Sequence, residues 1–301
     1  MKKTLLFGGS GFLGHIFLRE YPTIISAGRT HPSQPDSVIK NTHINIPDMD
    51  SLHLLDDIEF DNVIFLIGNS NHHIINSSCM MGMEYNVIPL KKILHYLQKR
   101  KINKFVCFTS ILLYGNEPKG RPVHENDTIY PYQNEYIFSK YLAEQIVEFY
   151  KEKVPIINIR LCNIYGDTTL IRPDLVPTLI YDVLTKENPT VWNMNPKRDF
   201  IFTTDAASAI VKLLDTQYTG TINLGSGTMS SIEDIAKIIE DISDKKITSL
   251  NKEVTGVMEF VADISLLKKL TNWEPKYSLR EGFIKTYNIM KNNLLKKEHK
   301  K

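Results

Sequence analysis

The stretch Thr4-Leu5-Leu6-Phe7-Gly8-Gly9-Ser10-Gly11-Phe12-Leu13-Gly14 decides the fold of this chain. Its short, mostly apolar start predicts a buried β-strand, and the pattern from Phe12 onward predicts an α-helix directly after it. Glycines at positions 8, 11 and 14 allow a sharp turn, a close approach of phosphate to the helix N-terminus, and tight packing of helix on strand. This order of elements is typical of a dinucleotide-binding unit, although a tight turn without a ligand would leave the same pattern.

Short apolar runs alternate with longer amphipathic segments through the rest of the first half. We expect strands at residues 24–27, 62–67, 104–109 and 156–161, and helices at residues 86–100 and 135–151. Because parallel strands must be joined by crossovers, this alternation predicts an α/β fold with a doubly wound parallel (Rossmann) sheet.

The pattern changes after Gly166, where prolines separate shorter helical segments. We expect helices at residues 175–185, 231–241 and 279–292, in a smaller, partly helical C-terminal lobe that selects the substrate. Residues 1–165 would then form the dinucleotide-binding domain. Residues 166–301 would form mainly the substrate-binding lobe, with a segment from about residue 200 to 225 returning to the Rossmann domain.

Composition and charge exclude several functional classes. Hydrophobic residues make up 42% of the chain and charged residues 23%, as in ordinary globular proteins. The net charge of +2 provides no basic field for nucleic acid, and the lysine-rich residues 296–301 are typical of a solvated chain end. The apolar run at residues 4–7 is too short for a signal peptide or a membrane span. We therefore expect a cytoplasmic protein that binds neither nucleic acid nor membrane.

The three cysteines, Cys79, Cys107 and Cys162, lie far apart in the sequence. They form no CxxC pair and no cluster with histidines. We therefore expect free, buried thiols and no metal site.

Tyr136 and Lys140 are the candidate acid/base pair. They stand four residues apart in one expected helix, so their side chains rise from the same face. A nearby ammonium stabilises a phenolate, which lowers the pKa of the phenol and makes it usable as an acid or base near neutral pH. The same spacing occurs by chance in many helices. Ser110 strengthens the case, because it ends the strand expected at residues 104–109 and its hydroxyl can bond a substrate oxygen there.

Arg29 bears on the choice of cofactor. The segment Ser26-Ala27-Gly28-Arg29-Thr30 follows the second strand and contains no Asp or Glu that would hold a ribose 2′-hydroxyl. An arginine there suits a 2′-phosphate, which favours NADP(H), with NAD(H) as the alternative. Arg29 could instead be a surface residue that stacks on adenine or faces water.

The sequence resembles the extended short-chain dehydrogenase/reductase family, which includes nucleotide-sugar epimerases, dehydratases and ketoreductases. The resemblance covers almost the whole chain. The matching motifs are the glycine turn from Gly8; Asn86-Val87; Ser110-Ile111-Leu112-Leu113-Tyr114-Gly115; Tyr136 with Lys140; Arg160-Leu161-Cys162-Asn163-Ile164-Tyr165-Gly166; Arg198-Asp199-Phe200-Ile201; Asn223-Leu224-Gly225; and Asp263 with Trp273-Glu274-Pro275.

The resemblance implies a role for each matching residue. Gly8, Gly11, Phe12, Leu13 and Gly14 would hold the cofactor, with Arg29, Tyr136 and Lys140. Ser110 would polarise the reacting oxygen, Tyr136 would exchange its proton, and Lys140 would tune Tyr136 and bond the nicotinamide ribose. Asn163 and Arg198 would hold the nucleotide and diphosphate of the substrate. Arg198 could instead be paired with Asp199 or Asp205.

The chain departs from the family pattern at three places. Ile111-Leu112 stand where dehydratases carry an acidic pair, which argues against dehydration. The Arg-x-Gly-Asp segment expected near residues 255–259 is missing, which leaves one diphosphate anchor in doubt. His72 and His73 follow the strand expected at residues 62–67, where they either orient the substrate or make only local contacts.

Three functional hypotheses follow. The first is reduction by NADPH of a nucleotide-linked 4-keto-6-deoxy sugar at C4. The alternative is C4 epimerisation of a nucleotide sugar with tightly bound NAD. The third, an inactive cofactor-binding regulator, is disfavoured because Ser110, Tyr136 and Lys140 are all present. The family resemblance also implies a homodimer formed through the helices expected at residues 86–100 and 135–151.

Overall fold

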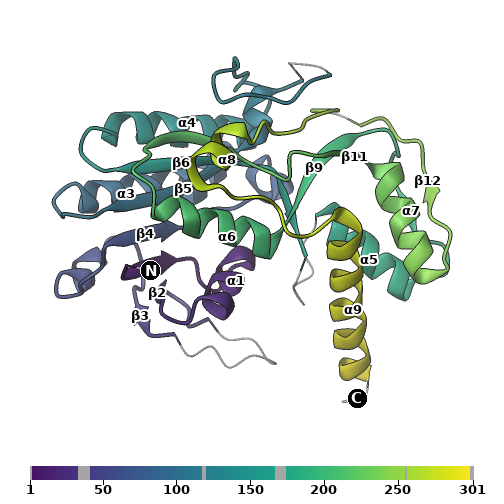
Figure 1. Ribbon diagram of the computed structural model, residues 1–301, viewed down its shortest axis with the longest axis horizontal. Coiled ribbons are helices and arrows are strands. Elements are labelled where there is room, and N and C mark those ends of the chain that lie inside the picture. The colour runs from purple at the N-terminus through teal and green to yellow at the C-terminus, as the bar shows by residue number, and fades with distance from the viewer. Residues whose placement is uncertain (1, 33–40, 117–119, 167–173, 255, 299–301) are drawn as a thin grey trace.

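A seven-stranded parallel sheet forms the larger part of the molecule (Figure 1). The structure is a computed structural model that describes residues 2–32, 41–116, 120–166, 174–254 and 256–298. In spatial order the strands are β10 (Gly220–Leu224), β6 (Ile156–Leu161), β5 (Lys104–Ser110), β4 (Asn62–Phe65), β1 (Thr4–Phe7), β2 (Ile25–Gly28) and β3 (His43–Asn45). The order reverses direction between β1 and β4. The doubly wound topology predicted from the sequence is therefore confirmed.

Helices cover both faces of this sheet. On one face lie α1 (Phe12–Glu20) and α6 (Thr203–Leu214), and on the other α3 (Ile88–Leu97) and α4 (Glu135–Tyr150) (Figure 1). Because both faces are covered, strands such as β5 are buried almost throughout and lack an alternating pattern.

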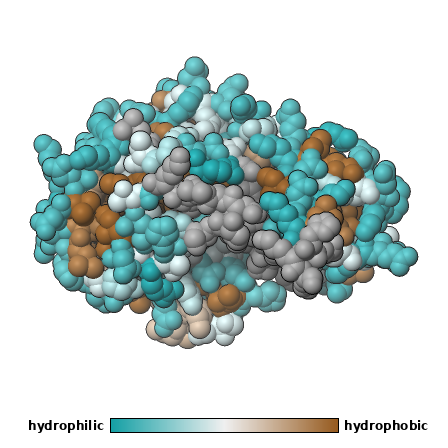
Figure 2. Space-filling view, turned by 90° about the horizontal axis from the view of Figure 1, so that it is seen from below, coloured by the Kyte–Doolittle hydropathy of each residue, from teal (hydrophilic) through white to brown (hydrophobic). Residues whose placement is uncertain are grey.

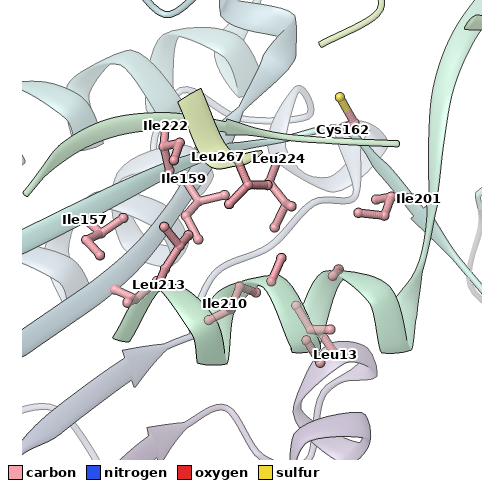
Figure 3. Packing of buried hydrophobic residues seen from close by; sticks show 14 of the residues in the cluster. Leu13, Ile157, Ile159, Cys162, Ile201, Ile210, Leu213, Ile222, Leu224 and Leu267 are labelled. Carbon is pink, nitrogen blue, oxygen red and sulfur yellow. The ribbon is translucent and has the colours of Figure 1, made fainter. Parts of the chain in front are cut away.

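The sequence analysis did not detect α6. This helix packs on β6 and β10, where Ile157, Ile159, Ile222 and Leu224 of the strands meet Ile210 and Leu213 of the helix (Figure 3). Leu267 of α8 (Ser265–Thr271) packs against the same cluster. Residues 203–214 and 220–224 thus lie with the large sheet as α6 and β10, while the division into two domains expected from the sequence stays a prediction.

A smaller lobe contains most of the remaining elements that follow β6. It contains a three-stranded sheet of β7 (Asn163–Tyr165), β9 (Lys197–Phe202) and β11 (Met229–Ser231), and a two-stranded sheet of β8 (Thr190–Val191) and β12 (Thr248–Ser249). Its helices are α5 (Leu175–Thr185), α7 (Ile232–Ser243) and α9 (Leu279–Glu298). A separate core of its own, which includes Tyr165, Phe202 and Phe283, holds these elements together.

Short helical turns complete the fold. They are η1 (Leu52–Leu55), α2 (His72–Ile75), η2 (Met83–Val87), a π-helical turn, and η3 (Ile111–Tyr114). The helix expected at residues 86–100 therefore begins as η2 and becomes α-helical only at Ile88, with a proline in its first turn.

The surface is mostly hydrophilic on the face shown in Figure 2, with hydrophobic residues in small separate patches. Within the described residues no helix is both long and apolar enough to cross a membrane. The His, Cys, Asp and Glu side chains of the same residues form no group of three or more that could hold a metal ion. Cys107 and Cys162 are buried free thiols, but the expectation of burial is wrong for Cys79, which lies exposed in a turn after α2. Residues 299–301 of the lysine-rich end lie outside the described part.

Candidate active site

The carboxyl ends of β1, β4, β5 and β6 open into one cavity of about 1550 Å³. Its wall includes most of the predicted site residues: Gly8, Gly11, Phe12, Leu13, Gly14, Ser110, Tyr136, Lys140, Asn163 and Arg198. A cavity of this size exceeds the roughly 300–1,000 Å³ usual for one small ligand, so it has room for a cofactor and a substrate together. Arg29 is exposed after β2 and is not among the described residues that line this cavity.

The glycine turn fits a dinucleotide. Gly8 has a φ of +86°, which a residue with a side chain rarely adopts. A Cβ at Gly14 would collide with the carbonyl oxygen of Gly8, so helix and turn can approach this closely only with glycine there. α1 begins after Gly11 without a side-chain cap, and the start of the helix lies on the cavity wall. A pyrophosphate would find backbone N–H groups and the positive end of the helix dipole at this place.

Tyr136 and Lys140 project from the first turns of α4 into the same cavity. Tyr136 is 5% exposed and Lys140 is 9% exposed. The Nζ of Lys140 lies 5.8 Å from the ring centroid of Tyr136 and donates to the carbonyl oxygen of Phe108 at 3.4 Å. Burial lowers the pKa of Lys140 to about 8. No carboxylate of the described residues forms an ion pair with it, so its charge is available to a phenolate or a ligand.

Ser110 ends β5 at the cavity wall. Its Oγ accepts a hydrogen bond from the N–H of Leu112 at 3.2 Å, which leaves its own hydrogen for an acceptor in the cavity. Ile111 is buried and Leu112 lines the cavity, so neither supplies acid/base chemistry. Among the described wall residues the one carboxylate is that of Asp174, just before α5.

Arg198 reaches the cavity from β9. Its Nη1 donates to the carbonyl oxygens of Lys197 at 2.9 Å and Met258 at 2.5 Å, and its guanidinium lies 5.2 Å from the ring centroid of Phe260. Burial among these neighbours lowers the pKa of Arg198 to about 10. In the described part of the chain no carboxylate pairs with it.

The two acids proposed as alternative partners of Arg198 are engaged elsewhere. Asp199 is fully buried and accepts hydrogen bonds from the N–H groups of Ser226, Gly227 and Ala262. Asp205 accepts from the N–H of Tyr277. The alternative in which Arg198 is locked to Asp199 or Asp205 is therefore wrong, and its charge faces the cavity instead.

Two residues of the cavity wall, Trp192 and His72, have a position or a contact in the site that was not predicted from the sequence. Trp192 follows β8, is 63% exposed and lies on the same wall as Arg198. The sequence shows a tryptophan a few residues before Arg198, but it was not predicted to belong to the site. His72 stacks on Tyr136, with ring centroids 4.0 Å apart and an interplanar angle of 26°. The sequence showed the histidine but not this contact.

The sheet, the glycine turn and the cavity with its serine, tyrosine and lysine together define a dinucleotide-dependent enzyme with room for a second ligand. The comparison with known families makes the class specific. The model of the NAD dependent epimerase/dehydratase family matches residues 4–225, so the chain belongs to this family of nucleotide-sugar-modifying enzymes.

Individual relatives agree in length as well as in fold. A putative UDP-glucose 4-epimerase of Methanocaldococcus jannaschii is 28% identical over 305 residues, which cover 96% of this chain and 98% of the relative. The structure of a UDP-glucose 4-epimerase of Thermotoga maritima with UDP-glucose superimposes with a TM-score of 0.87 at 20% identity, covering 97% of this chain and 99% of that one. A UDP-glucuronic acid 4-epimerase of Bacillus cereus, solved with UDP-glucuronic acid and NAD, gives a TM-score of 0.83 at 24% identity with the same coverage.

Proposed function

We propose that this enzyme is a nucleotide-sugar 4-epimerase that keeps its nicotinamide cofactor bound through the reaction. The observation that carries the proposal is the pair of cations, Lys140 and Arg198, that face one cavity without a carboxylate partner in the described residues. Burying an uncompensated charge is costly, so such groups persist where a ligand supplies the counter-charge. The names of the relatives support 4-epimerisation over the reduction favoured by the sequence alone.

The substrate's nucleotide diphosphate would bind at the Arg198 end. The planar guanidinium of Arg198, fixed by two backbone carbonyls, pairs well with phosphate oxygens. Trp192 offers an exposed ring on which a nucleobase can stack. Asn163, at the start of β7, lines the same cavity and adds an amide that can bond the nucleotide or the sugar.

The sugar would then lie between Arg198 and the glycine turn, beside Tyr136. The cofactor, when bound, supplies hydride exchange. Tyr136 takes the proton of the 4-hydroxyl as C4 is oxidised and returns it to the same oxygen after the sugar has turned, so that C4 would be reduced on its opposite face. Lys140 stabilises the phenolate form of Tyr136, and Ser110 donates a hydrogen bond to the reacting oxygen. The size of the cavity allows the sugar to turn without leaving it.

A second candidate is the reduction of a nucleotide-linked 4-keto-6-deoxy sugar by NADPH. The residue that favours it is Arg29, since NADP(H) suits an enzyme that exchanges its cofactor at each turnover. We infer NADP(H) as the preferred form from Arg29, although the B. cereus relative contains NAD. The apolar pair Ile111-Leu112 is compatible with both candidates and argues against dehydration.

One experiment separates the candidates. Purified enzyme is incubated with UDP-glucose or UDP-glucuronic acid, with and without added cofactor, and C4 epimers are resolved by chromatography while nicotinamide absorbance is followed. Epimer formation without net absorbance change supports the first candidate, and stoichiometric NADPH consumption with a 4-keto sugar supports the second. Tyr136→Phe should lower either activity by more than about 100-fold, because it removes the proton and little volume. Turnover of that variant within tenfold of the wild type would sink both.

We also infer a homodimer that works in the cytoplasm. Exposed apolar side chains at Ile88 of α3 and Phe149 of α4 support an interface through these helices, as the family resemblance implies. The free thiols suit a reducing compartment. Light scattering of the wild type and of Phe149→Lys would test the interface, and a monomeric wild type would refute it.

A further inference from the structure

His72 and Tyr136 form a stacked pair on the cavity wall. The two residues come from different elements, α2 after β4 and α4 after β5, yet their ring centroids lie only 4.0 Å apart. Both line the cavity, and His72 keeps an open side toward it. The phenol ring that would exchange the substrate's proton is therefore covered by an imidazole before any ligand binds.

Hydrogen bonds on both sides of α2 hold this contact in place. On the C-terminal side, the Oδ1 of Asn76 accepts from the N–H of Tyr136 at 2.9 Å. On the N-terminal side, Asn86 accepts from the N–H of Asn69 at 2.8 Å and donates to the Oγ of Ser139 at 3.0 Å. The hydroxyl of Ser139 in turn donates to the carbonyl oxygen of Tyr136 at 2.7 Å. The segment with His72 is thus tied to the backbone of Tyr136 itself.

We propose that His72 is a positioning residue for Tyr136, whose ring it holds by stacking so that the phenol oxygen meets the substrate in one orientation. The proposal rests on the proposed function, in which Tyr136 exchanges the proton. A tyrosine ring pivots about two side-chain torsions, and a small displacement of a reacting group is costly for the rate. The stack limits that pivoting on one side of the ring, and offset aromatic contacts of this kind favour a defined geometry.

The charges around His72 are compatible with a neutral imidazole in this role. Burial against the protein lowers the pKa of His72, the carboxylate of Asp174 opposes that effect, and Lys140 and His73 reinforce it. A neutral ring adds no second charge beside Tyr136, so Lys140 remains the group that stabilises the phenolate. The function of His72 would then depend on its flat ring and not on a proton.

Two substitutions of His72 distinguish a role of its flat ring from a role of its ring nitrogens. His72→Ala removes the stack, and we expect kcat to fall about tenfold with KM and cofactor affinity changed less than about twofold. His72→Phe keeps a flat ring, and we expect its kcat within about threefold of the wild type. The matched control is Ile74→Ala on the same short helix, whose side chain is exposed and lies off the cavity wall. If His72→Phe were as slow as His72→Ala, a ring nitrogen would be required and the stacking role would be overturned.

A measurement independent of turnover keeps the test separate from the proposed function. The protein is labelled with 3-fluorotyrosine, and the fluorine resonance of residue 136 is assigned from its absence in Tyr136→Phe. We expect this resonance to shift in His72→Ala and to stay in place in Ile74→Ala, because the imidazole ring current is lost in the first variant alone. An unchanged resonance in His72→Ala would overturn the stack. A shifted resonance in an enzyme that converts no nucleotide sugar would refute the proposed function and leave the contact standing.

Discussion

Two arginines of this protein, Arg160 and Arg198, differ in the partners that surround their positive charge. Arg160 on β6 is buried and donates two hydrogen bonds to Glu144 of α4, at 2.8 and 2.7 Å, and one to the hydroxyl of Tyr114 at 2.8 Å. Burial alone would lower the pKa of Arg160, but the bonds and charge of Glu144 outweigh it and raise that pKa. Among the described residues, Arg198 on β9 contacts carbonyl oxygens and an aromatic ring but pairs with no carboxylate, and burial lowers its pKa.

The difference indicates which charge serves the fold and which serves a ligand. Arg160, with its bidentate carboxylate partner and its bonds to Tyr114 and to the carbonyl oxygen of Glu125, joins strand and helix and has its charge neutralised within the fold. A cation held by neutral acceptors at a cavity wall keeps most of its electrostatic field for what enters the cavity. Lys140 resembles Arg198 in this respect, since its Nζ donates to a carbonyl oxygen and no carboxylate of the described residues pairs with it. We expect the fold to tolerate the cost at these two positions because a bound ligand would supply the counter-charge.

Breaking the paired arginine should give the largest effect. Arg160→Leu leaves Glu144 buried without its counter-charge, and we expect the free energy of unfolding to fall by about 3–5 kcal/mol, measured by urea denaturation. The control is the double variant Arg160→Leu with Glu144→Leu, which removes both charges and should recover part of the loss. A loss below about 1 kcal/mol in the single variant would show that the pair contributes little to the fold.

Removing the unpaired arginine should affect binding and spare stability. We expect Arg198→Leu to raise the Kd for UDP about 100-fold in titration calorimetry, because two charge-assisted hydrogen bonds are lost. Its free energy of unfolding should stay within about 1 kcal/mol of the wild type, since no charged partner is left buried and both carbonyl acceptors keep a backbone N–H donor. Equal losses of stability in Arg198→Leu and Arg160→Leu would contradict the idea that Arg160 stabilises the fold and Arg198 binds a ligand.

Local patterns were enough to predict the central elements of the fold. The strand, glycine turn and helix at residues 4–20 follow from sequence-adjacent residues, and α5 and β6 match their expected bounds. α6 was missed although its apolar residues share one face; three of them are alanines, Ala206, Ala207 and Ala209, whose burial depends on the sheet beneath the helix. β3 was missed because it is a three-residue edge strand without a fully buried residue.

In the candidate site, too, some features could be predicted from local sequence and others could not. Ser110, Tyr136 and Lys140 were predicted from strand ends and helical spacing, and the structure places all three on one cavity wall. The stack of His72 on Tyr136 could not be predicted, because it depends on how two distant segments meet. β9 was not predicted from the sequence, and only its presence shows that Arg198 and Asp199, as successive residues of a strand, point to opposite faces.

The buried charge of Lys140 should make the free energy of unfolding depend on pH. The pKa of Lys140 is about 8 in the folded protein and near the ordinary lysine value of 10.5 in the unfolded chain. Between these values the unfolded chain binds more protons, so the stability of the wild type rises with pH in this window. We expect Lys140→Met to be more stable than the wild type by about 1–3 kcal/mol at pH 7, with the gap closing above pH 8. Lys99→Met, which removes an exposed charge, corrects for the change in net charge. A gap that is constant with pH would mean that Lys140 is not desolvated as the structure indicates.

Arg29 extends the comparison to an arginine at the surface, where the smallest effect is expected. A charge in water gains little from a single contact, so its contribution to binding a 2′-phosphate should be about tenfold in Kd, much less than that of Arg198. We expect Arg29→Ser to weaken NADPH binding by that factor and to leave NADH binding within about twofold, measured by the quenching of protein fluorescence. Arg19→Ser is the matched control, because Arg19 is also exposed and the change removes the same charge from the last turn of α1. If the wild type binds NADH more tightly than NADPH, Arg29 does not read the 2′-phosphate, and the case for a cofactor-consuming reductase weakens with it.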